Sequence, residues 1–256
     1  MAGEPLTPTG WQLRQLPVCG SSEDELDAWL AELGPDAQTT LQGSSLAVVA
    51  QQQLQGRGQR GRTWQSPPGG LWLSAAMAWP AGTTSVGGGA PLTLAAAVGL
   101  ALQLETLGLA PRIKWPNDLL LEGRKLAGLL ARLRLAGERV RWAQVGVGLN
   151  GTNPVPAGAI GLAAVLPPHQ ATPDALLPLV LAGLDWARSQ AQNGQGVLLL
   201  ANQRLHRPAQ GVLHQGQWCQ VDGLGPQGSL LVRCGAQQLA LRQLEPGDDL
   251  SPENRA

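Results

Sequence analysis

Residues 56–62 hold three glycines and three arginines within seven positions, Gly-Arg-Gly-Gln-Arg-Gly-Arg. Glycine lets the backbone approach a ligand closely, and arginine offers a planar pair of donors that suits phosphate or carboxylate. The segment also satisfies the G-x-G-x-x-G pattern, but a dinucleotide-binding turn must open a helix. Pro67, Pro68, Gly69 and Gly70 follow instead, which forbids a helix here. We therefore predict an anion-binding Arg/Gly loop between two strands.

The overall composition is that of a globular chain without a strong charge bias. Its 256 residues are 43% apolar, which is enough for one large domain and a small one. Only 14% are charged and the formal net charge is zero, so no overall field attracts nucleic acid or a membrane surface. Pro5 and Pro8 interrupt the apolar run that a signal peptide needs, and no later apolar run would span a bilayer. We expect a cytoplasmic protein.

The chain has three cysteines, Cys19, Cys219 and Cys234. Their odd number and the lack of C-x-x-C spacing argue against a disulfide framework and against a zinc knuckle. We therefore expect free thiols, which suit a reducing cytosol.

Two capping patterns predict the starts of helices. Ser22 followed by Glu25 is a capping box, and the apolar positions after it share one helical face until Gly34 ends the helix. Thr172 caps another helix, with Pro173 in its first turn. Between them we expect an apolar helix over 92–107 and strands over 46–50, 71–77, 112–115, 119–121, 125–135 and 140–149. Short turns join the later strands, so the sheet should be mostly antiparallel.

The pattern changes near residue 204 to short alternating strands around Gly-rich turns. Strands are expected over 211–213, 218–221, 229–233 and 238–241. We predict a small β-barrel over 204–250 and a tail over 251–256, after a partly disordered segment 1–14 and a main domain 15–203. The expected fold class is α/β (α+β), a mixed sheet flanked by helices plus the small barrel.

Two further segments combine polar side chains with turn formers. Residues 114–118 read Lys-Trp-Pro-Asn-Asp and residues 124–128 read Arg-Lys-Leu-Ala-Gly, and each alone could be only a turn. With the Arg/Gly loop they supply arginines for phosphates, an amide and a carboxylate on a rigid turn, a lysine beside a glycine gap, and a tryptophan for stacking. The Arg/Gly loop alone could also be an RNA-contacting tract, but such tracts are longer and repetitive.

Four ordered motifs carry a resemblance to a known family. They are Gly56-Arg57-Gly58-x-Arg60-Gly61-Arg62-x-Trp64-x-Ser66-Pro67, Lys114-Trp115-Pro116-Asn117-Asp118, Arg124-Lys125-Leu126-Ala127-Gly128 and Gly146-x-Gly148-Leu149-Asn150. In order, type and approximate spacing the chain resembles the biotin–protein ligases over residues 15–250. The resemblance implies a catalytic core of one mixed sheet flanked by helices and a C-terminal SH3-like barrel. It also implies the form without an N-terminal DNA-binding domain, hence a ligase that is not a repressor.

The resemblance assigns residues to a biotin site and to an adenylate site. Gly20 and Glu23 replace an Asp and an Asn of the family's biotin-contacting element, and Gln59 stands where many members have an arginine. The residues implied at biotin are Ser21, Ser22, Glu23, Gln53, Arg57, Gly58, Gln59, Lys125 and Gly128. The residues implied around ATP and the adenylate are Arg57, Arg60, Arg62, Trp64, Lys114, Asn117, Asp118, Gly148 and Asn150.

The implied reaction needs no enzyme nucleophile, because the biotin carboxylate itself attacks the α-phosphate of ATP. Arg57 and Lys125 would offset the repulsion between the two anions, with Mg²⁺ bridging phosphates and no protein ligand assigned to the metal. A lysine of the biotin carboxyl carrier protein of acetyl-CoA carboxylase would then attack the mixed anhydride. Asp118 is the candidate for removing its proton. The resemblance leaves open whether the chain forms a homodimer.

Two other functions fit parts of the pattern. A lipoate or octanoate–protein ligase or transferase would use a related fold, but these acids lack the ureido ring that Gln53, Ser21 and Ser22 would bind. A nucleic-acid-binding module could be built on the Arg/Gly loop and the small barrel. The zero net charge and the few aromatics after residue 204 argue against that module.

Overall fold

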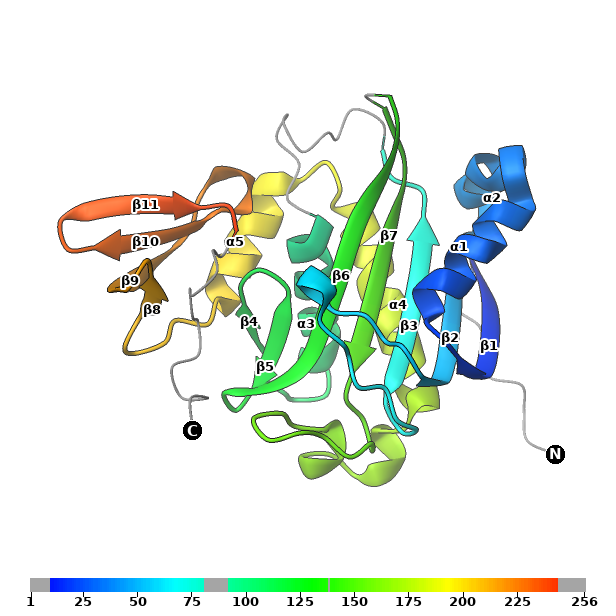
Figure 1. The fold of residues 1–256 in the computed structure, drawn as a ribbon, viewed down its shortest axis with the longest axis horizontal. Coiled ribbons are helices and arrows are strands. Elements are labelled where there is room, and N and C mark those ends of the chain that lie inside the picture. Colours follow the sequence, from blue (N-terminus) through cyan, green and yellow to red (C-terminus); the bar gives the residue numbers. More distant parts are fainter. Residues whose placement is uncertain (1–9, 81–91, 138, 244–256) are drawn as a thin grey trace.

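The computed structural model describes residues 10–80, 92–137 and 139–243. The expected disorder at residues 1–9 and the tail 251–256 therefore lie outside the described residues. The centre of the molecule is a seven-stranded mixed sheet with helices on both faces (Figure 1). In spatial order the strands are β1 (Trp11–Cys19), β2 (Ser45–Gln53), β3 (Leu71–Met77), β7 (Arg139–Leu149), β6 (Arg124–Ala136), β5 (Asp118–Leu121) and β4 (Arg112–Lys114).

Strand pairing in this sheet confirms the predicted mostly antiparallel arrangement. Among the described strands β1 and β2 run parallel, and every other neighbouring pair is antiparallel. The Arg/Gly loop connects β2 to β3, as the sequence predicts. The long β6–β7 hairpin places Gly128 directly opposite Gly148. This pairing brings together two of the four sequence motifs.

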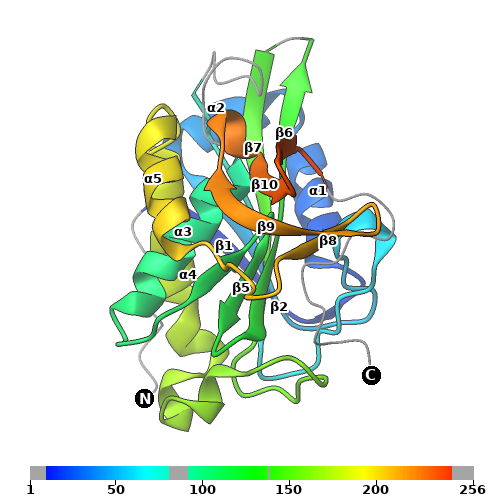
Figure 2. The ribbon, with the colours of Figure 1, turned by 90° about the vertical axis from the view of Figure 1, so that its left-hand side faces the viewer.

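Helices cover both faces of the sheet (Figure 2). One face carries α3 (Leu92–Glu105), α4 (Pro173–Ser189) and α5 (Gly194–Arg204), and the other carries α1 (Ser22–Leu33) and α2 (Ala37–Gly43). Strand β2 shows why two layers form, because successive side chains point to opposite faces. Ala47 packs with the larger helical layer, while Leu46 packs with α1 and α2. Both faces of this strand are therefore buried.

Local capping explains where the helices begin. Thr172 caps α4 by accepting a hydrogen bond from the Ala175 amide at 3.4 Å, as predicted. The cap of α1 differs by one residue from the prediction. Ser21 is the N-cap and accepts from the Glu23 amide, whereas Ser22 is the first helical residue and its hydroxyl bonds with Ser74 at 2.9 Å. The Ser22 hydroxyl therefore does not cap the helix and is buried in the interior of the molecule.

Three elements depart from the prediction. Strand β1 begins at Trp11, so residues 11–14 of the segment predicted to be partly disordered are part of the sheet. The buried Trp11 anchors this strand, and its indole donates to Asp185 of α4 at 2.9 Å. Helices α2 and α5 were not predicted. Each buries few side chains, so the hydrophobic periodicity that predicts a helix is weak in both.

The C-terminal strands form an antiparallel sheet in the order β11 (Gln237–Leu241), β10 (Leu230–Cys234), β9 (Gln217–Leu224) and β8 (Val212–His214). All four match predicted strands to within a few residues. Within the part of the chain that the structure describes, this sheet is open, since β8 and β11 do not pair.

The expectation of free thiols is wrong for two cysteines. A disulfide bond joins Cys219 of β9 to Cys234 of β10, and Cys19 is a buried free thiol. Spacing in the sequence did not reveal this pair, because it forms only when two neighbouring strands bring positions 15 residues apart side by side.

The C-terminal sheet packs on the main domain through a continuous apolar core. Trp115, in the turn before β5, donates its indole N–H to the carbonyl of Gly228 at 2.8 Å. This contact fixes the loop between β9 and β10 next to the end of the large sheet. None of the described helices is long and apolar enough to cross a membrane.

Candidate active site

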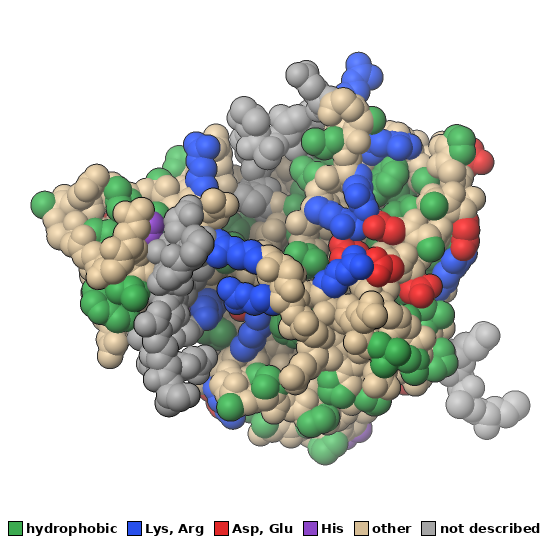
Figure 3. Space-filling view, in the orientation of Figure 1, with side chains coloured by type: hydrophobic (Ala, Val, Ile, Leu, Met, Phe, Trp, Pro, Cys, Tyr) green, Lys and Arg blue, Asp and Glu red, His purple; other side chains and the backbone are tan. Residues whose placement is uncertain are grey.

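A cavity of about 1100 Å³ lies where the Arg/Gly loop, β6, β7, the 114–118 turn and the C-terminal sheet meet. Of the residues that the sequence places at a site, all line this cavity except Asn150. Six of the chain's 18 Lys and Arg residues line it, against two acidic residues, Glu23 and Asp118. Figure 3 shows basic side chains gathered near the middle of this face. In a chain of zero net charge, this concentration points to a polyanionic ligand.

The Arg/Gly loop is a small hairpin rather than an extended tract. The Gly58 amide donates to the Arg62 carbonyl at 2.7 Å, and the Trp64 amide donates to the Gly56 carbonyl at 2.9 Å. Arg60, at the tip, has a positive φ of 59°. Gly56 has no room for a side chain, because a Cβ atom there would run into the Trp64 carbonyl and the Ser66 hydroxyl. Glycine is therefore required at position 56, because residues 64–66 pass too close for a side chain.

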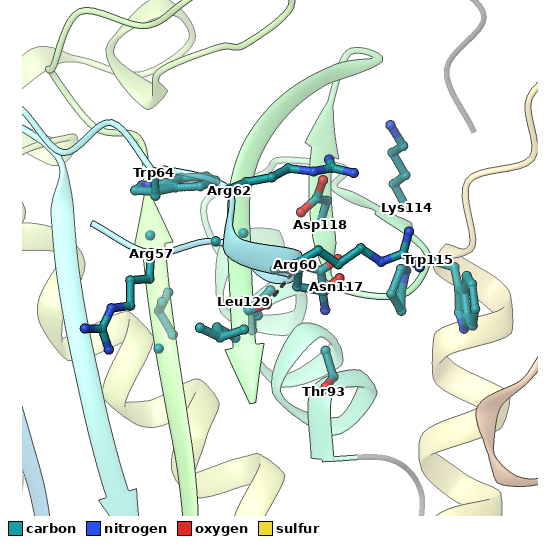
Figure 4. Close-up of a pocket in the computed structure, with 18 of the residues that line it drawn as sticks. Arg57, Arg60, Arg62, Trp64, Thr93, Lys114, Trp115, Asn117, Asp118 and Leu129 are labelled. Atoms are coloured by element: carbon teal, nitrogen blue, oxygen red, sulfur yellow. Dashed lines mark hydrogen bonds between the residues drawn. The ribbon is translucent and has the colours of Figure 1, made fainter. Parts of the chain in front are cut away.

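The three arginines of the loop point in two directions (Figure 4). Arg60 and Arg62 extend toward the side where Asn117 and Asp118 lie, and Arg57 extends the opposite way. Arg57 forms an ion pair with Asp24 of α1 at 2.8 Å and lies 3.8 Å from Glu23. The Arg57 guanidinium therefore lies away from Arg60 and Arg62 in this structure.

Trp64 lies over the paired glycines of β6 and β7. A Cβ atom added to Gly148 would lie 2.5 Å from the Trp64 Nε1, and one added to Gly128 would lie 2.7 Å from its Cζ3. The sequence predicted a gap at Gly128, and the structure shows that the Trp64 indole covers both glycines. The Trp64 indole N–H is buried and has no hydrogen-bond partner among the described residues.

Lys125 of β6 and Asp118 of the neighbouring strand β5 form an ion pair at 2.8 Å, beside the face of Trp64. The Lys125 ammonium is 4.8 Å from the centre of the indole ring, which is a cation–π distance. The second oxygen of Asp118 is buried without a partner in the described part of the chain. Asn117 is fixed by donating to the Leu129 carbonyl at 3.0 Å. The 114–118 turn is thus a rigid support and not a solvated turn.

The other end of the cavity is polar, with neutral hydrogen-bonding side chains beside Glu23. Gln53 accepts from the Ser22 amide at 2.7 Å and donates to the Ser66 hydroxyl at 2.8 Å. The hydroxyls of Ser22 and Ser74 bond to each other, and both residues are buried. Ser74 was not predicted, because a serine within an apolar strand carries no distinctive signal. This end is suited to a ligand with its own donors and acceptors.

Asn150 lies behind the cavity. It is buried, donates to the Lys125 carbonyl at 3.5 Å and accepts from Asn153 at 3.2 Å. Its amide therefore supports the strand that carries Lys125. Other lining residues were missed because they come from distant segments, namely Thr93 at the start of α3 and residues 226–229, 240 and 242 of the C-terminal sheet.

The residues that the structure describes contain no group of three or more His, Cys, Asp or Glu side chains that could hold a metal ion.

The same arrangement of strands and helices occurs in solved biotin protein ligases. The enzyme from Aquifex aeolicus in complex with biotin and ATP superposes with a TM-score of 0.69 at 20% identity, covering 93% of this chain and 97% of that one. The enzyme from Leishmania major in complex with biotinyl-5-AMP gives 0.58 at 20% identity, covering 93% and 100%. At this level of identity the likeness defines the fold.

Sequence comparison defines the family. Residues 35–150 match the model of the biotin/lipoate A/B protein ligase family, and the chain belongs to that family. It is 34% identical over 182 residues to a biotin–[acetyl-CoA-carboxylase] ligase of Paracoccus denitrificans, covering 66% of this chain and 70% of the relative. It is also 38% identical over 107 residues to the bifunctional ligase/repressor BirA of Bacillus spizizenii, but spans only 31% of that protein's length.

Proposed function

We propose that this protein is an ATP-dependent biotin–protein ligase. It activates biotin to biotinyl-5′-AMP and transfers biotin to a lysine of a biotin carboxyl carrier protein domain of acetyl-CoA carboxylase. One observation carries the proposal: a single cavity joins a polar, hydrogen-bonding end to a strongly cationic end, in a chain of this family. The ureido ring of biotin matches the hydrogen-bonding end, and the phosphates of ATP match the cationic end.

At the polar end, Ser21, Ser22, Glu23 and Gln53 would surround the ureido ring. The hydrogen bonds of Gln53 fix its side chain before any ligand arrives, so little ordering accompanies binding. Gly128 and Gly148 leave bare backbone on which Trp64 packs directly, so the indole would form part of the wall of the biotin site. Gly58 and Gln59 would close the loop over the carboxylate arm of biotin.

At the cationic end, Arg60, Arg62 and Lys114 would hold the phosphates, and Asn117 the nucleotide. The C-terminal sheet adds Arg242 to the same wall. Mg²⁺ entering with ATP would neutralise phosphate charge, and its ligands stay unassigned. Asn150 would act indirectly, by supporting the backbone of Lys125.

The chemistry follows from placing Lys125 between the two ends. A carboxylate oxygen of biotin attacks the α-phosphorus, the bond to the β-phosphate breaks, and pyrophosphate leaves. Lys125 stabilises the charge that develops on the transferred group, and Arg57 would join it after leaving Asp24. In the second step the carrier lysine attacks the acyl carbonyl, AMP leaves, and the amine proton passes to a base. Asp118, with its unpartnered oxygen, is the base proposed.

We also propose how the chain divides into domains. We assign the catalytic domain to residues 15–203, extended by β1 to Trp11, and an SH3-like unit to residues 204–250. The small size of the C-terminal sheet and its four short antiparallel strands support this assignment. We also propose that the enzyme is cytoplasmic. The zero net charge supports an enzyme that does not bind nucleic acid. Light scattering in solution would decide between a monomer and a homodimer.

Pyrophosphate release tests the function directly. The protein is incubated with labelled ATP and Mg²⁺, and with biotin, lipoate or octanoate in separate reactions. We expect release that depends on biotin and not on the other two acids, because they would leave the polar end unpaired. Release supported by lipoate or octanoate but not by biotin would instead identify a lipoate-type ligase. A filter-binding assay at low salt with RNA and DNA tests the nucleic-acid alternative.

A further inference from the structure

The Cys219–Cys234 disulfide encloses the loop by which the C-terminal sheet reaches the cavity. Arg233 faces Gln220 in the β9–β10 ladder, and the two cysteines occupy the next position, farther from the loop. Residues 226–229, between these strands, line the cavity. The bond therefore closes a covalent ring around one part of the cavity wall.

Non-covalent contacts also hold this loop, but the sheet behind it is small. The Gly228 carbonyl accepts from the Trp115 indole at 2.8 Å, and the β9–β10 ladder shifts register between Leu231 and Val232. A small sheet has little core of its own, so a cross-link contributes much of its order. Loss of the disulfide should therefore loosen residues 226–229.

Reduction of the bond is compatible with a folded sheet. Cys219 is fully buried and Cys234 is 9% exposed, and both lie in the apolar core. A thiol behaves as a small hydrophobic group, so the same places accept two thiols. In the reducing cytosol, where we place the enzyme, disulfides are usually transient and either catalytic or redox-sensing. Both redox states are therefore available to the folded protein.

We propose that Cys219 and Cys234 are a redox-modification site that sets the affinity of the cavity for ATP. This inference rests on the proposed function and adds regulation of its nucleotide-binding end. In the disulfide form, the covalent ring holds residues 226–229 in place for ATP. In the dithiol form, the loop occupies that geometry for part of the time, and the ATP affinity falls by the same fraction. The polar end lies on α1, β2 and β3, so biotin affinity should not change.

The electrons for reduction come from a dithiol reductant. One of its thiolates attacks a sulfur of the disulfide, the S–S bond breaks, and a mixed disulfide forms. The second thiol of the reductant then displaces the protein sulfur. The reductant leaves as a disulfide, and its two protons pass to the sulfurs of Cys219 and Cys234.

Cys19 takes no part in this exchange. Burial, together with the charges of Glu25 and Asp24, raises the pKa of the Cys19 thiol to about 11. The thiolate is the form that attacks a disulfide, so a thiol that stays protonated near neutral pH is inert. The reductant must therefore come from outside the chain.

Thiol titration in denaturant tests whether the bond is present and reversible. Protein oxidised with glutathione disulfide should show one thiol, that of Cys19, and protein treated with dithiothreitol should show three. Reoxidation should return the count to one. Three thiols after oxidation, or one after dithiothreitol, would overturn the proposal.

Pyrophosphate release at saturating biotin tests the effect on ATP. The KM for ATP should be about 10-fold higher in the reduced protein, which corresponds to a loop that is in place about one-tenth of the time. The kcat and the KM for biotin should stay near their values in the oxidised protein, and reoxidation should restore the lower KM for ATP. A melting temperature lowered by reduction with an unchanged KM for ATP would make the disulfide merely structural and refute the switch. An equal rise in the KM for biotin would also refute it.

Two variants serve as controls. Cys219→Ala combined with Cys234→Ala removes the switch, so its KM for ATP should be high with or without dithiothreitol. Cys19→Ala keeps the disulfide and should respond to dithiothreitol as wild type does. A redox response that persists in the double variant, or is lost in Cys19→Ala, would contradict the assignment. If the double variant does not fold, the comparison of oxidised and reduced wild type still decides, because it needs no substitution.

The outcome also distinguishes this inference from the proposed function. If both redox forms release pyrophosphate with biotin at the same KM for ATP, only the inference fails. If neither form releases pyrophosphate with biotin, both fail.

Discussion

The indole of Trp64 covers Gly148 so closely that a Cβ atom on the glycine would lie 2.5 Å from the indole nitrogen. Gly128, opposite Gly148 in the β6–β7 pair, lies under the other edge of the same ring. The floor of the cavity is therefore bare backbone, and the tryptophan of the Arg/Gly loop packs on it directly. This contact joins the loop to the sheet at the place where we propose that biotin binds.

Gly148→Ala should destabilise the protein, because the added methyl group must displace Trp64. We expect about 1–3 kcal/mol of lost stability, the usual cost of overpacking a filled site. Gly146→Ala is a matched control two residues away on β7. Its Cβ would lie no closer than 3.6 Å to any neighbour, so its stability should stay close to wild type. Urea unfolding measures both, and equal effects of the two substitutions would refute the packing role of Trp64.

Lys125→Ala should leave the fold intact and slow adenylate formation by about 100-fold or more, as expected when a charge that stabilises a transition state is removed. The control is Arg124→Ala, which removes the neighbouring cation that pairs with Glu122 outside the cavity. Biotin-dependent pyrophosphate release should be near wild type in that control. A normal rate in Lys125→Ala would show that Lys125 serves only its ion pair with Asp118.

Much of the fold was predictable because it depends on local patterns. The strands on either side of the Arg/Gly loop and the helix after Thr172 follow from periodicity and capping. Strand β1 was missed because it is an edge strand whose mixed polar residues, with Pro17, resemble a loop. This segment is ordered as a strand because it pairs with β2, and its own composition does not indicate a strand.

The sequence also predicted which residues line the site, but it did not predict where their side chains point. Motifs show which residues gather, so nearly all of the expected residues line one cavity. They do not show that Arg57 turns toward Asp24, because α1 reaches that place only through the tertiary fold. The same reason hides the contribution of Arg242, which the C-terminal sheet brings to the cavity from far along the chain.

Gln59→Arg should make the enzyme retain biotinyl-AMP more firmly. The neutral amide of wild type lacks a charge-assisted contact of about 1.5–3 kcal/mol, so the intermediate should escape about 10- to 100-fold faster than from the variant. Escaped anhydride acylates any amine, so wild type should label a bystander protein that lacks a biotin-accepting domain. Gln55→Arg adds the same charge outside the cavity and serves as the control. Equal bystander labelling by wild type and Gln59→Arg would contradict this prediction.

Stability should depend on pH through Asp27. Burial alone would raise the pKa of Asp27, but hydrogen bonds from Gln144 and Arg134 and the charge of Arg132 lower it below its ordinary value of 3.8. A lowered pKa contributes stability that is fully present above the unfolded value and is lost as the pH falls through the folded value.

Asp27→Asn should therefore cost about 0.5–1.5 kcal/mol near neutral pH, since the pair is partly exposed, and the cost should shrink below about pH 4. Urea unfolding at several pH values measures it, with Asp36→Asn as a control outside the network. A difference from wild type that stays constant down to about pH 3 would rule out this linkage.

Identifying the intermediate tests most directly whether this protein is a biotin–protein ligase. Wild type is incubated with biotin, ATP and Mg²⁺, and the small molecules that remain bound or are released are analysed by mass spectrometry. A biotin carboxyl carrier domain is then added. We expect biotinyl-AMP in the first stage, and in the second stage its loss together with biotin on one lysine of the carrier. Unchanged biotin and ATP in the first stage, with no adenylate formed, would contradict it.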